Sequence, residues 1–189
     1  MMIDLPQLSE LVNGFSATAF RLETLDAYAA GSDGGDVARY LAGEPAPDPA
    51  RKEPWLTRLR TEQAEGRLRQ CVHVLLSPLS PYLRYECEWG YLPNSDAGQD
   101  IRILDLAERP YPDALAGIDH DFWLIDSETV ARMTYDDDGR FTEAEILPPA
   151  ELPRYLAARD AALAAAEPFP SYWNRHPQFH RGNQASQVA

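Results

Sequence analysis

An apolar run of strand length near the middle of the chain places the strongest constraint on the fold. Ser77-Pro78 ends this run, whose apolar members are Leu68, Cys71, Val72, Val74, Leu75 and Leu76. Successive residues of a strand point to opposite faces of a sheet, so a run that is apolar on both faces must be covered on both. The segment over 67–76 is therefore expected to be a central strand of a covered sheet.

The residues after this strand alternate between strand and helix patterns. Turn residues at Asp136–Gly139 predict a hairpin between two of the strands, because Asp and Gly tolerate left-handed backbone conformations. The order is strand, helix, four strands and helix, which predicts an α+β (α/β-like) fold, a mixed β-sheet flanked by helices. The expected elements are a helix over 82–91, strands over 101–106, 122–125, 129–135 and 140–147, and an Ala-rich helix over 150–167.

The N-terminal third is expected to add a further strand to this sheet, preceded by an extra N-terminal helix and followed by two more helices. Asp4 is the expected N-cap of the first helix, and Pro6 fits its first turn. Pro54 is expected to open a later helix whose apolar side is formed by Trp55, Leu56 and Leu59. The expected elements are a helix over 5–13, a strand over 18–25, and helices over 36–41 and 55–65.

The length of 189 residues fits one domain. We expect a single globular domain over 1–174 with its core over 15–170. Residues 175–189 are polar with little apolar content, so we expect them to form a flexible C-terminal tail.

The charge balance argues against two classes of partner. The chain carries 30 acidic and 17 basic side chains, a formal net charge of −13, which repels phosphate backbones and anionic lipid heads. No apolar run approaches the length needed to cross a bilayer, and the N-terminus has no signal-peptide pattern. We expect a cytoplasmic protein that binds neither nucleic acid directly nor membranes.

Aromatic and charged side chains that suit a ligand- or partner-binding surface cluster on the helix over 82–91, on the strand with Arg21 and Glu23, and at the strand that follows Asp121. Rings with a polar tip concentrate on the helix over 82–91, which also brings aromatic side chains near Arg102. Arg21 and Glu23 share one face of a strand, and Arg21 can hold a carboxylate if that face is covered. Core packing, a solvated strand edge and strand-end turns are the competing interpretations. The candidate residues are Arg21, Glu23, Tyr82, Tyr85, Glu86, Trp89, Arg102, Asp121 and Trp123.

The sequence contains no strong signature of catalysis. It lacks a Gly-rich phosphate loop, a GxSxG elbow and a Cys/His nucleophile pattern, and we expect no catalytic residue, metal or cofactor. Cys71 and Cys87 have no zinc-site spacing. They are interpreted as reduced, partly buried thiols, and whether they pair stays open.

Several phrases of the sequence resemble an uncharacterised actinobacterial family, a domain of unknown function often encoded near helix-turn-helix regulators. The resemblance covers about residues 15–170 and implies a role near transcriptional regulators. The phrases that carry it begin at Thr18 (TAFRLE), Pro54 (PW), Ser77 (SPLSPY), Ala97 (AGQDIRI), His120 (HDFWLID) and Met133 (MTYDDDG).

A weaker likeness concerns architecture alone. Residues 69–169 are similar in order to one half of the phospholipase D-like fold, which also occurs as a non-catalytic module in bacterial regulators. The enzymes of that fold need a His-x-Lys-x4-Asp motif. Here His120 precedes Asp126 by six residues, and Asp121 or Phe122 stands where the lysine belongs. The resemblance thus implies a non-catalytic half.

These observations lead to three functional hypotheses. The first is a non-enzymatic regulatory or binding module that recognises a protein partner, for example a helix-turn-helix regulator, or a small molecule. The second is a small enzyme of the biosynthetic tailoring type, which uses carboxylates such as Asp121 and Glu86 with Arg21 or Arg102 as an anion clamp. The third is an acidic, antitoxin-like protein that covers a basic surface. The oligomeric state does not follow from the sequence.

Overall fold

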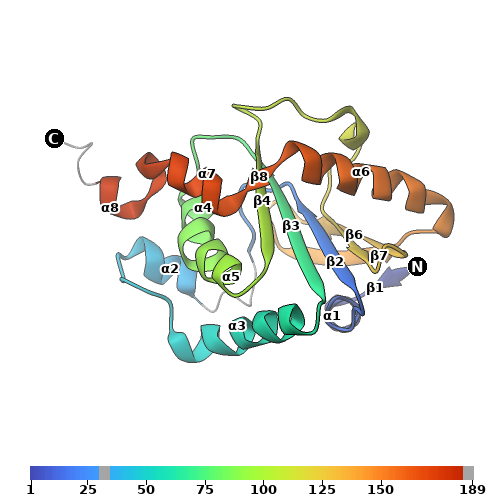
Figure 1. Cartoon of the computed structure of the whole chain (residues 1–189), viewed down its shortest axis with the longest axis horizontal. Coiled ribbons are helices and arrows are strands. Elements are labelled where there is room, and N and C mark those ends of the chain that lie inside the picture. The colour runs from blue at the N-terminus through green and yellow to red at the C-terminus, as the bar shows by residue number, and fades with distance from the viewer. Residues whose placement is uncertain (30–34, 185–189) are drawn as a thin grey trace.

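A mixed β-sheet runs through the computed structural model, which describes residues 1–29 and 35–184 (Figure 1). Within these residues the sheet has eight strands in the order β1-β7-β6-β5-β2-β3-β4-β8. β2 pairs in parallel with β3, and β3 with β4, while the other pairs are antiparallel. The strands are β1 (Met2–Ile3), β2 (Thr18–Glu23), β3 (Leu68–Leu75), β4 (Asp100–Asp105), β5 (Phe122–Ile125), β6 (Thr129–Tyr135), β7 (Phe141–Ile146) and β8 (Glu167–Pro168).

Helices cover both faces of this sheet. Figure 1 shows α6 along the upper side of the sheet, with α3 and α1 along the lower side. None of the helices within residues 1–29 and 35–184 is long and apolar enough to cross a membrane. The helices are α1 (Leu5–Asn13), α2 (Asp36–Leu41), α3 (Pro49–Ala64), α4 (Pro81–Tyr85), the π-helix η2 (Glu86–Tyr91), α5 (Leu92–Asp96), α6 (Leu152–Ala165), α7 (Phe169–Arg175) and α8 (Arg181–Gln184), with 3-10 turns η3 (Asp113–Leu115), η4 (Pro149–Glu151) and η5 (Pro177–Phe179).

The predicted fold class and the central strand are confirmed. β3 lies between β2 and β4, and its alternating residues enter two different apolar clusters. Val72 and Val74 pack toward Tyr155 and other residues of α6, whereas Cys71 belongs to the cluster formed with α4 and α7. The sheet therefore has two covered faces, as the two-faced apolar run required.

Local sequence signals explain several element boundaries. Asp4 caps α1, where it accepts a hydrogen bond from the Gln7 backbone N–H, and the Gln7 side chain accepts one from the Asp4 backbone N–H. The predicted hairpin is formed by β6 and β7. At its turn Asp136 accepts hydrogen bonds from the backbone N–H groups of Asp138 and Arg140, and Gly139 adopts φ 76°.

Two predicted helices differ from those observed. The predicted helix over 82–91 is α4 followed by the π-helix η2, and α5 continues directly from Tyr91. α3 begins at Pro49 with Asp48 as its N-cap, so Pro54 lies inside the helix and does not open it. The Glu62 side chain of α3 is buried, and its carboxylate pairs with the Arg69 guanidinium through two contacts of 2.8 Å.

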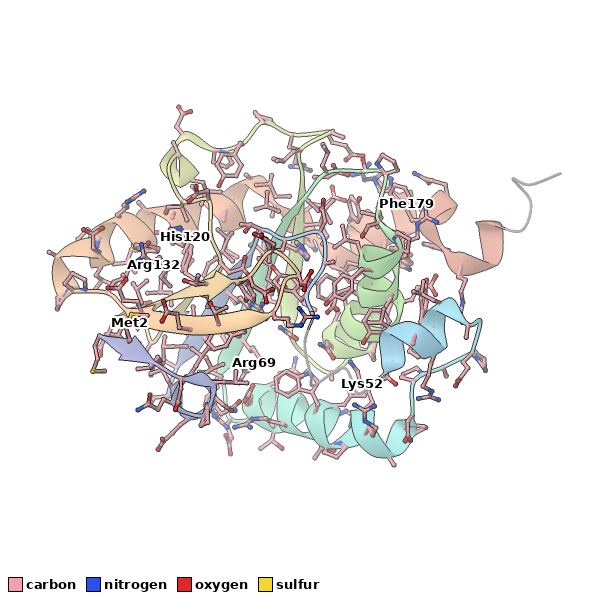
Figure 2. All side chains as sticks on the ribbon, turned by 180° about the vertical axis from the view of Figure 1, so that it is seen from behind. Met2, Lys52, Arg69, His120, Arg132 and Phe179 are labelled. Carbon is pink, nitrogen blue, oxygen red and sulfur yellow. The ribbon has the colours of Figure 1, made fainter. Side chains whose placement is uncertain are left out.

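The end of the chain also differs from the expected tail. Residues 175–184 contain a 3-10 turn and a short helix, and Phe179 is buried in the cluster that contains Leu83 and Trp173. Figure 2 shows Phe179 next to α4. The sequence offered little indication that this segment packs on the domain, because Phe179 is its single large apolar residue. Residues 185–189 lie outside the described part of the chain.

Candidate functional site

Polar side chains replace the apolar core along the middle of one face of the sheet. On this face an apolar cluster around α4 and α7 and another around α1 leave a gap between them. The strand pairing places Arg21 beside Cys71 and Trp123, and Glu23 beside His73. Because these residues alternate with apolar neighbours that face α6, the polar row is built into the central strands.

Arg21 is at the centre of the polar row. Its Nη2 lies 3.0 Å from Glu23 Oε1 and 3.4 Å from Asp121 Oδ2, and it donates to the Tyr135 hydroxyl at 3.3 Å. The guanidinium also lies over the rings of Tyr28 and Trp123. Burial acts to lower the pKa of Arg21, but the surrounding groups, Glu23 first, raise it well above its usual value. Arg21 is therefore a fixed cation.

Asp121, immediately before β5, holds the loop after β2 in place. Its Oδ1 accepts hydrogen bonds from the backbone N–H and the hydroxyl of Thr24 at 2.8 and 2.9 Å. Its Oδ2 accepts from the hydroxyls of Tyr28 at 2.7 Å and Tyr135 at 3.2 Å, and from Arg21. The side chain is fully buried. With this many donors the carboxylate acts as a structural anchor.

Glu23 collects a second set of hydrogen bonds. Its Oε2 accepts from the Cys71 thiol and from the Tyr91 hydroxyl, both at 2.9 Å, and His73 Nδ1 lies 2.7 Å from the same hydroxyl. Burial works against the charged form, yet Arg21, His73 and these hydrogen bonds lower the pKa of Glu23. Burial, followed by the charge of Glu23, raises the pKa of Cys71 well above its usual value.

A pocket with a volume of about 970 Å³ opens above Arg21 and Glu23. We call it the outer pocket. Its walls come from α1, α3, α4, η2, the loop after β2 and the β6–β7 hairpin, and five of its fourteen described lining residues are aromatic. The Tyr28 ring lies 5.3 Å from that of Tyr135 and 6.2 Å from that of Tyr82. The other lining residues are Leu5, Ser9, Arg21, Glu23, Ala29, Trp55, Glu86, Met133, Gly139, Arg140 and Phe141.

A smaller cavity of about 200 Å³ adjoins the outer pocket, because the two share Arg21, Glu23, Trp55 and Glu86. We call it the inner chamber. Three of its lining residues carry a buried polar atom that has no hydrogen-bond partner among the described residues: Arg21 Nε and the side-chain oxygens of Asn94 and Gln99. Buried polar atoms usually have partners, so these three atoms set the lining of the inner chamber apart from the apolar clusters on either side. Its remaining lining residues are Val12, Asn13, Arg69, Cys71, Tyr91 and Trp123.

The π-helix η2 positions Glu86 at the junction of the two cavities. A Cβ atom built on Gly90 would lie 2.7 Å from Glu86 Oε1, so the Glu86 side chain folds over a position that only glycine leaves open. π-helical turns are rare and frequently occur at functional sites. The sequence did not predict this turn, because its apolar spacing resembles that of an ordinary α-helix.

The structure brings together six of the nine predicted site residues. Arg21, Glu23, Tyr82 and Glu86 line the outer pocket. Trp123 lines the inner chamber, and the buried Asp121 carboxylate forms an ion pair with Arg21.

The other three predicted residues lie elsewhere. Tyr85 and Trp89 pack with Tyr40 in a separate buried cluster, as core residues. Arg102 interacts with Asp100 and with the Leu163 carbonyl of α6, on the opposite face of the sheet from Arg21. Arg102 cannot join Arg21 in one site.

Sequence reasoning missed several residues of the site. A usable signal was present in β3, where Arg69, Cys71 and His73 alternate with apolar residues on a strand otherwise interpreted as fully apolar. The walls had no such signal because they come from separate segments. The missed residues are Tyr28, Trp55, His73, Asn94, Gln99, Met133, Tyr135, Arg140 and Phe141.

His120 and Asp126 do not meet. His120 Nε2 lies 2.9 Å from the Tyr155 hydroxyl of α6, and Figure 2 shows His120 on the side of α6, away from Arg69. Burial, as the main cause, lowers the pKa of His120. Asp126 instead accepts hydrogen bonds from the backbone N–H groups of residues 16–18, which is a structural role.

These features define an α+β protein with a mixed sheet and a polar, aromatic-walled pocket on one sheet face. A family model described as a domain of unknown function, DUF6879, matches residues 6–174. The chain therefore belongs to the DUF6879 family, in agreement with the expected uncharacterised domain family. No curated protein sequence matches the chain.

Proposed function

We propose that this protein is a non-enzymatic binding module whose outer pocket takes a small organic ligand, in a setting linked to transcriptional regulation. The observation that carries the proposal is the position of Arg21 at the floor of an aromatic-walled pocket of about 970 Å³. Ligand sites are typically concave, lined mainly by apolar and aromatic groups, with a few polar groups that orient the ligand.

The floor of the pocket is organised before any ligand arrives. Arg21 is held by Glu23 and Asp121, and Asp121 is in turn held by Thr24 and Tyr28. A first layer supported in this way loses little conformational entropy on binding. Such rigidity suits recognition of one ligand geometry.

The geometry favours binding over the alternative of a small tailoring enzyme. Asp121, one of the two carboxylates named in the enzyme hypothesis, has its oxygens occupied by protein donors. Cys71 has a raised pKa, so it is a poor nucleophile near neutral pH. The second expected arginine, Arg102, contacts α6 on the other face of the sheet.

The regulator-linked setting and the actinobacterial origin rest on the family resemblance alone. In this proposal ligand binding changes how the module interacts with a helix-turn-helix regulator encoded nearby. The likeness to a phospholipase D-like half adds no chemistry, because His120 and Asp126 have separate structural contacts. Co-purification of the two proteins with and without ligand tests the regulatory part of the proposal.

A thermal-shift screen with a library of common metabolites tests the ligand-binding part. A ligand at a hundred times its dissociation constant stabilises the fold by about 2.7 kcal/mol. For a chain of this size that raises the melting temperature by roughly 5 to 10 °C. Tyr82→Ala, which opens the wall of the outer pocket, is expected to abolish the shift.

Tyr111→Ala serves as the matched control, because Tyr111 is a partly exposed tyrosine that bonds the Ile118 carbonyl and does not line either cavity. It is expected to keep the shift. A library that gives no shift, or shifts of equal size in the wild-type protein and in Tyr82→Ala, would overturn the proposed pocket.

A further inference from the structure

We propose that a corner between α2 and η2 is a receptor site for an arginine residue. Arg181 of the chain's own C-terminal segment occupies this site, and an arginine of a partner protein can take its place. We call it the arginine site, and its walls are Tyr40, Glu44, Glu88 and Trp89. None of these four is among the described lining residues of the outer pocket or the inner chamber. The inference therefore goes beyond the proposed function and does not depend on it.

Two aromatic rings form the base of the arginine site. The rings of Tyr40 and Trp89 lie at 84° to each other with centroids 5.5 Å apart, so their faces make a corner. The Arg181 guanidinium lies over both rings, 4.5 Å from the centre of the Tyr40 ring and 5.8 Å from that of Trp89. Aromatic faces attract a guanidinium electrostatically. The base of the site therefore suits a flat cation.

Two carbonyl groups at the C-terminal end of α2 bind the edge of the guanidinium. Arg181 Nη1 donates to the Tyr40 carbonyl at 2.9 Å, and Nη2 donates to the Glu44 carbonyl at 2.6 Å. Carbonyls at the end of a helix lack the N–H partners that the next turn would supply, so they are available to side-chain donors. Arginine presents its nitrogens in a rigid planar fork, whereas a lysine ammonium is a single point. The site is therefore expected to select arginine over lysine.

Glu88 contacts the main chain of the bound arginine as well as its side chain. Its Oε1 accepts a hydrogen bond from the backbone N–H of Arg181 at 2.5 Å, and its Oε2 lies 3.9 Å from Arg181 Nε. The Tyr40 side chain also hydrogen-bonds to Glu88, which helps to hold the carboxylate in place. A free guanidinium compound has no peptide N–H for Glu88. The contacts therefore favour an arginine that is part of a polypeptide.

The recognition does not come from an excess of negative charge at the site. Asp36 is paired with both Arg39 and Arg51. Glu44 is also paired with Arg39, and Arg84 is a further cation near the tyrosine ring of the site. Selectivity thus comes from the geometry of two rings, two carbonyls and one carboxylate. The net charge of −13 of the whole chain favours the approach of a basic partner at longer range.

Arg181 is attached in a way that allows exchange. Figure 1 shows α8, which begins at Arg181, beside α2 at the end of the molecule opposite the N-terminus. The Arg181 side chain is 29% exposed, and Gly182 after it is exposed, with no atom within 4 Å of a Cβ built there. Chain ends of this kind open locally at little cost in free energy. Arg181 can therefore leave the site while the buried Phe179 stays in place.

A tethered residue competes strongly with an arginine from outside. A short flexible connection gives an effective concentration on the order of millimolar. A partner's arginine must therefore bring further contacts of its own, or bind after Arg181 has been removed. Replacing Arg181 is expected to reveal the intrinsic affinity of the site.

NMR titration of the isotope-labelled full chain with blocked peptides tests the inference. The peptides are Gly-Arg-Gly, Gly-Lys-Gly and Gly-citrulline-Gly, each acetylated and amidated. Lysine keeps the charge without the fork, and citrulline keeps most of the shape without the charge. Agmatine carries the guanidinium without a peptide N–H. Arg181→Ala is expected to bind the arginine peptide at least tenfold more tightly than the wild-type protein does, and at least tenfold more tightly than it binds the other three probes.

The position of the bound peptide is read from the same spectra. The largest shift changes are expected at the backbone amides of Tyr40 and Glu44 and at the indole N–H of Trp89. Glu88→Gln added to Arg181→Ala removes the charge and keeps the shape, and it is expected to weaken binding of the arginine peptide at least fivefold.

Arg175→Ala is the matched control. Arg175 belongs to the same C-terminal segment, but it pairs with Glu108 and Glu167 instead of the arginine site. This variant is expected to bind the arginine peptide as weakly as the wild-type protein does. The dispersion of the amide signals verifies that each variant is folded.

Hydrogen exchange in the wild-type protein tests whether Arg181 is displaced. A saturating arginine peptide is expected to speed exchange of the Gly182 amide severalfold, whereas the lysine peptide at the same concentration leaves it unchanged. No acceleration at saturation would overturn the exchange of one arginine for another.

The remaining outcomes are equally decisive. Equal affinity of the wild-type protein and Arg181→Ala for the arginine peptide, or failure of the variant to bind it, overturns the receptor site. Lysine or citrulline peptides that bind as tightly overturn the selection of arginine. Agmatine that binds more tightly than the peptide overturns the assignment to a partner protein. Shift changes around the outer pocket instead of Trp89 overturn the location, and none of these results bears on a ligand that depends on Tyr82.

Discussion

The Glu23 carboxylate and the His73 imidazole lie 4.0 Å apart, and the Tyr91 hydroxyl lies within hydrogen-bonding distance of both. Tyr91 is 2.9 Å from Glu23 Oε2 and 2.7 Å from His73 Nδ1. The other ring nitrogen, Nε2, lies 3.0 Å from the Leu25 carbonyl. A carbonyl oxygen only accepts hydrogen bonds, so Nε2 must carry a proton.

The Tyr91 hydroxyl links the other two side chains. If it donates to the Glu23 carboxylate, its oxygen is left to accept a hydrogen bond from His73 Nδ1. These contacts tie β2, β3 and η2 together at the floor of the site.

The pH dependence of stability provides a test of the Glu23 interactions. Its pKa in the folded protein is lowered from the usual value of 4.5, chiefly by Arg21 acting against the cost of burial. A group with a lowered folded-state pKa contributes stability above its unfolded-state pKa and loses it as the pH falls through the folded-state value. The stability that Glu23 adds should therefore be constant above about pH 5.5 and decline below about pH 4.5.

Urea unfolding of the wild-type protein and of Glu23→Gln measures this effect between pH 3.5 and pH 7. The difference in unfolding free energy between the two proteins is expected to shrink by about 1.4 kcal/mol for each unit by which the pKa is lowered. Other carboxylates are common to both proteins and cancel in the difference. A difference that stays the same or grows as the pH falls would contradict the role given to Glu23.

Arg21 and Arg102 provide a matched pair for testing burial of charge. Arg21→Met leaves two buried carboxylates, Glu23 and Asp121, without their cation, and breaking a buried pair on one side costs about 3 to 5 kcal/mol. Arg102→Met removes a partly exposed ion pair with Asp100, which is worth about 0 to 1 kcal/mol. Urea unfolding at pH 7 is expected to separate the two variants by at least 2 kcal/mol. Equal losses would show that Arg21 is no more important to the fold than a surface arginine.

Local patterns predicted most of the fold. The two-faced run in β3, the Asp4 cap and the Asp136–Gly139 turn each depend on neighbours close in sequence, so they are visible without the structure. Helix η2 was not predictable in this way. Apolar spacing reveals neither its π geometry nor the close approach of the Glu86 side chain to Gly90.

The candidate site was predictable only in part, for a different reason. Arg21 and Glu23 were found because they alternate on one strand, but the depth of the site depends on β2 being central between β5 and β3. Tyr28 and Tyr135 reach Asp121 from segments about a hundred residues apart. The Tyr85 and Trp89 rings, which looked similar to Tyr82 in the sequence, pack on Tyr40 instead. Only the tertiary structure distinguishes aromatic residues that line the pocket from those that are buried in the core.

The packing of the C-terminal segment gives a final prediction. Phe179 is buried with Trp173 and Leu83, and the nearby His180 ring stacks on Trp173 with centroids 4.3 Å apart. Removing a buried Phe side chain costs about 3 to 5 kcal/mol when the cavity does not collapse. Because this segment lies at the end of the chain and can relax, we expect Phe179→Ala to lose about 2 to 3 kcal/mol of unfolding free energy.

Asn174→Ala is the control for this change, since Asn174 is exposed on the preceding helix and an ordinary surface change alters stability by no more than about 0.5 kcal/mol. Arg181 adds a second reason for the segment to stay attached, because it donates to the carbonyls of Tyr40 and Glu44. Arg181→Ala should therefore increase the rate of proteolysis after Phe179. It should leave the global unfolding free energy nearly unchanged. Unfolding free energies of Phe179→Ala and Asn174→Ala that do not differ would mean that residues 175–184 form the tail that the sequence predicted.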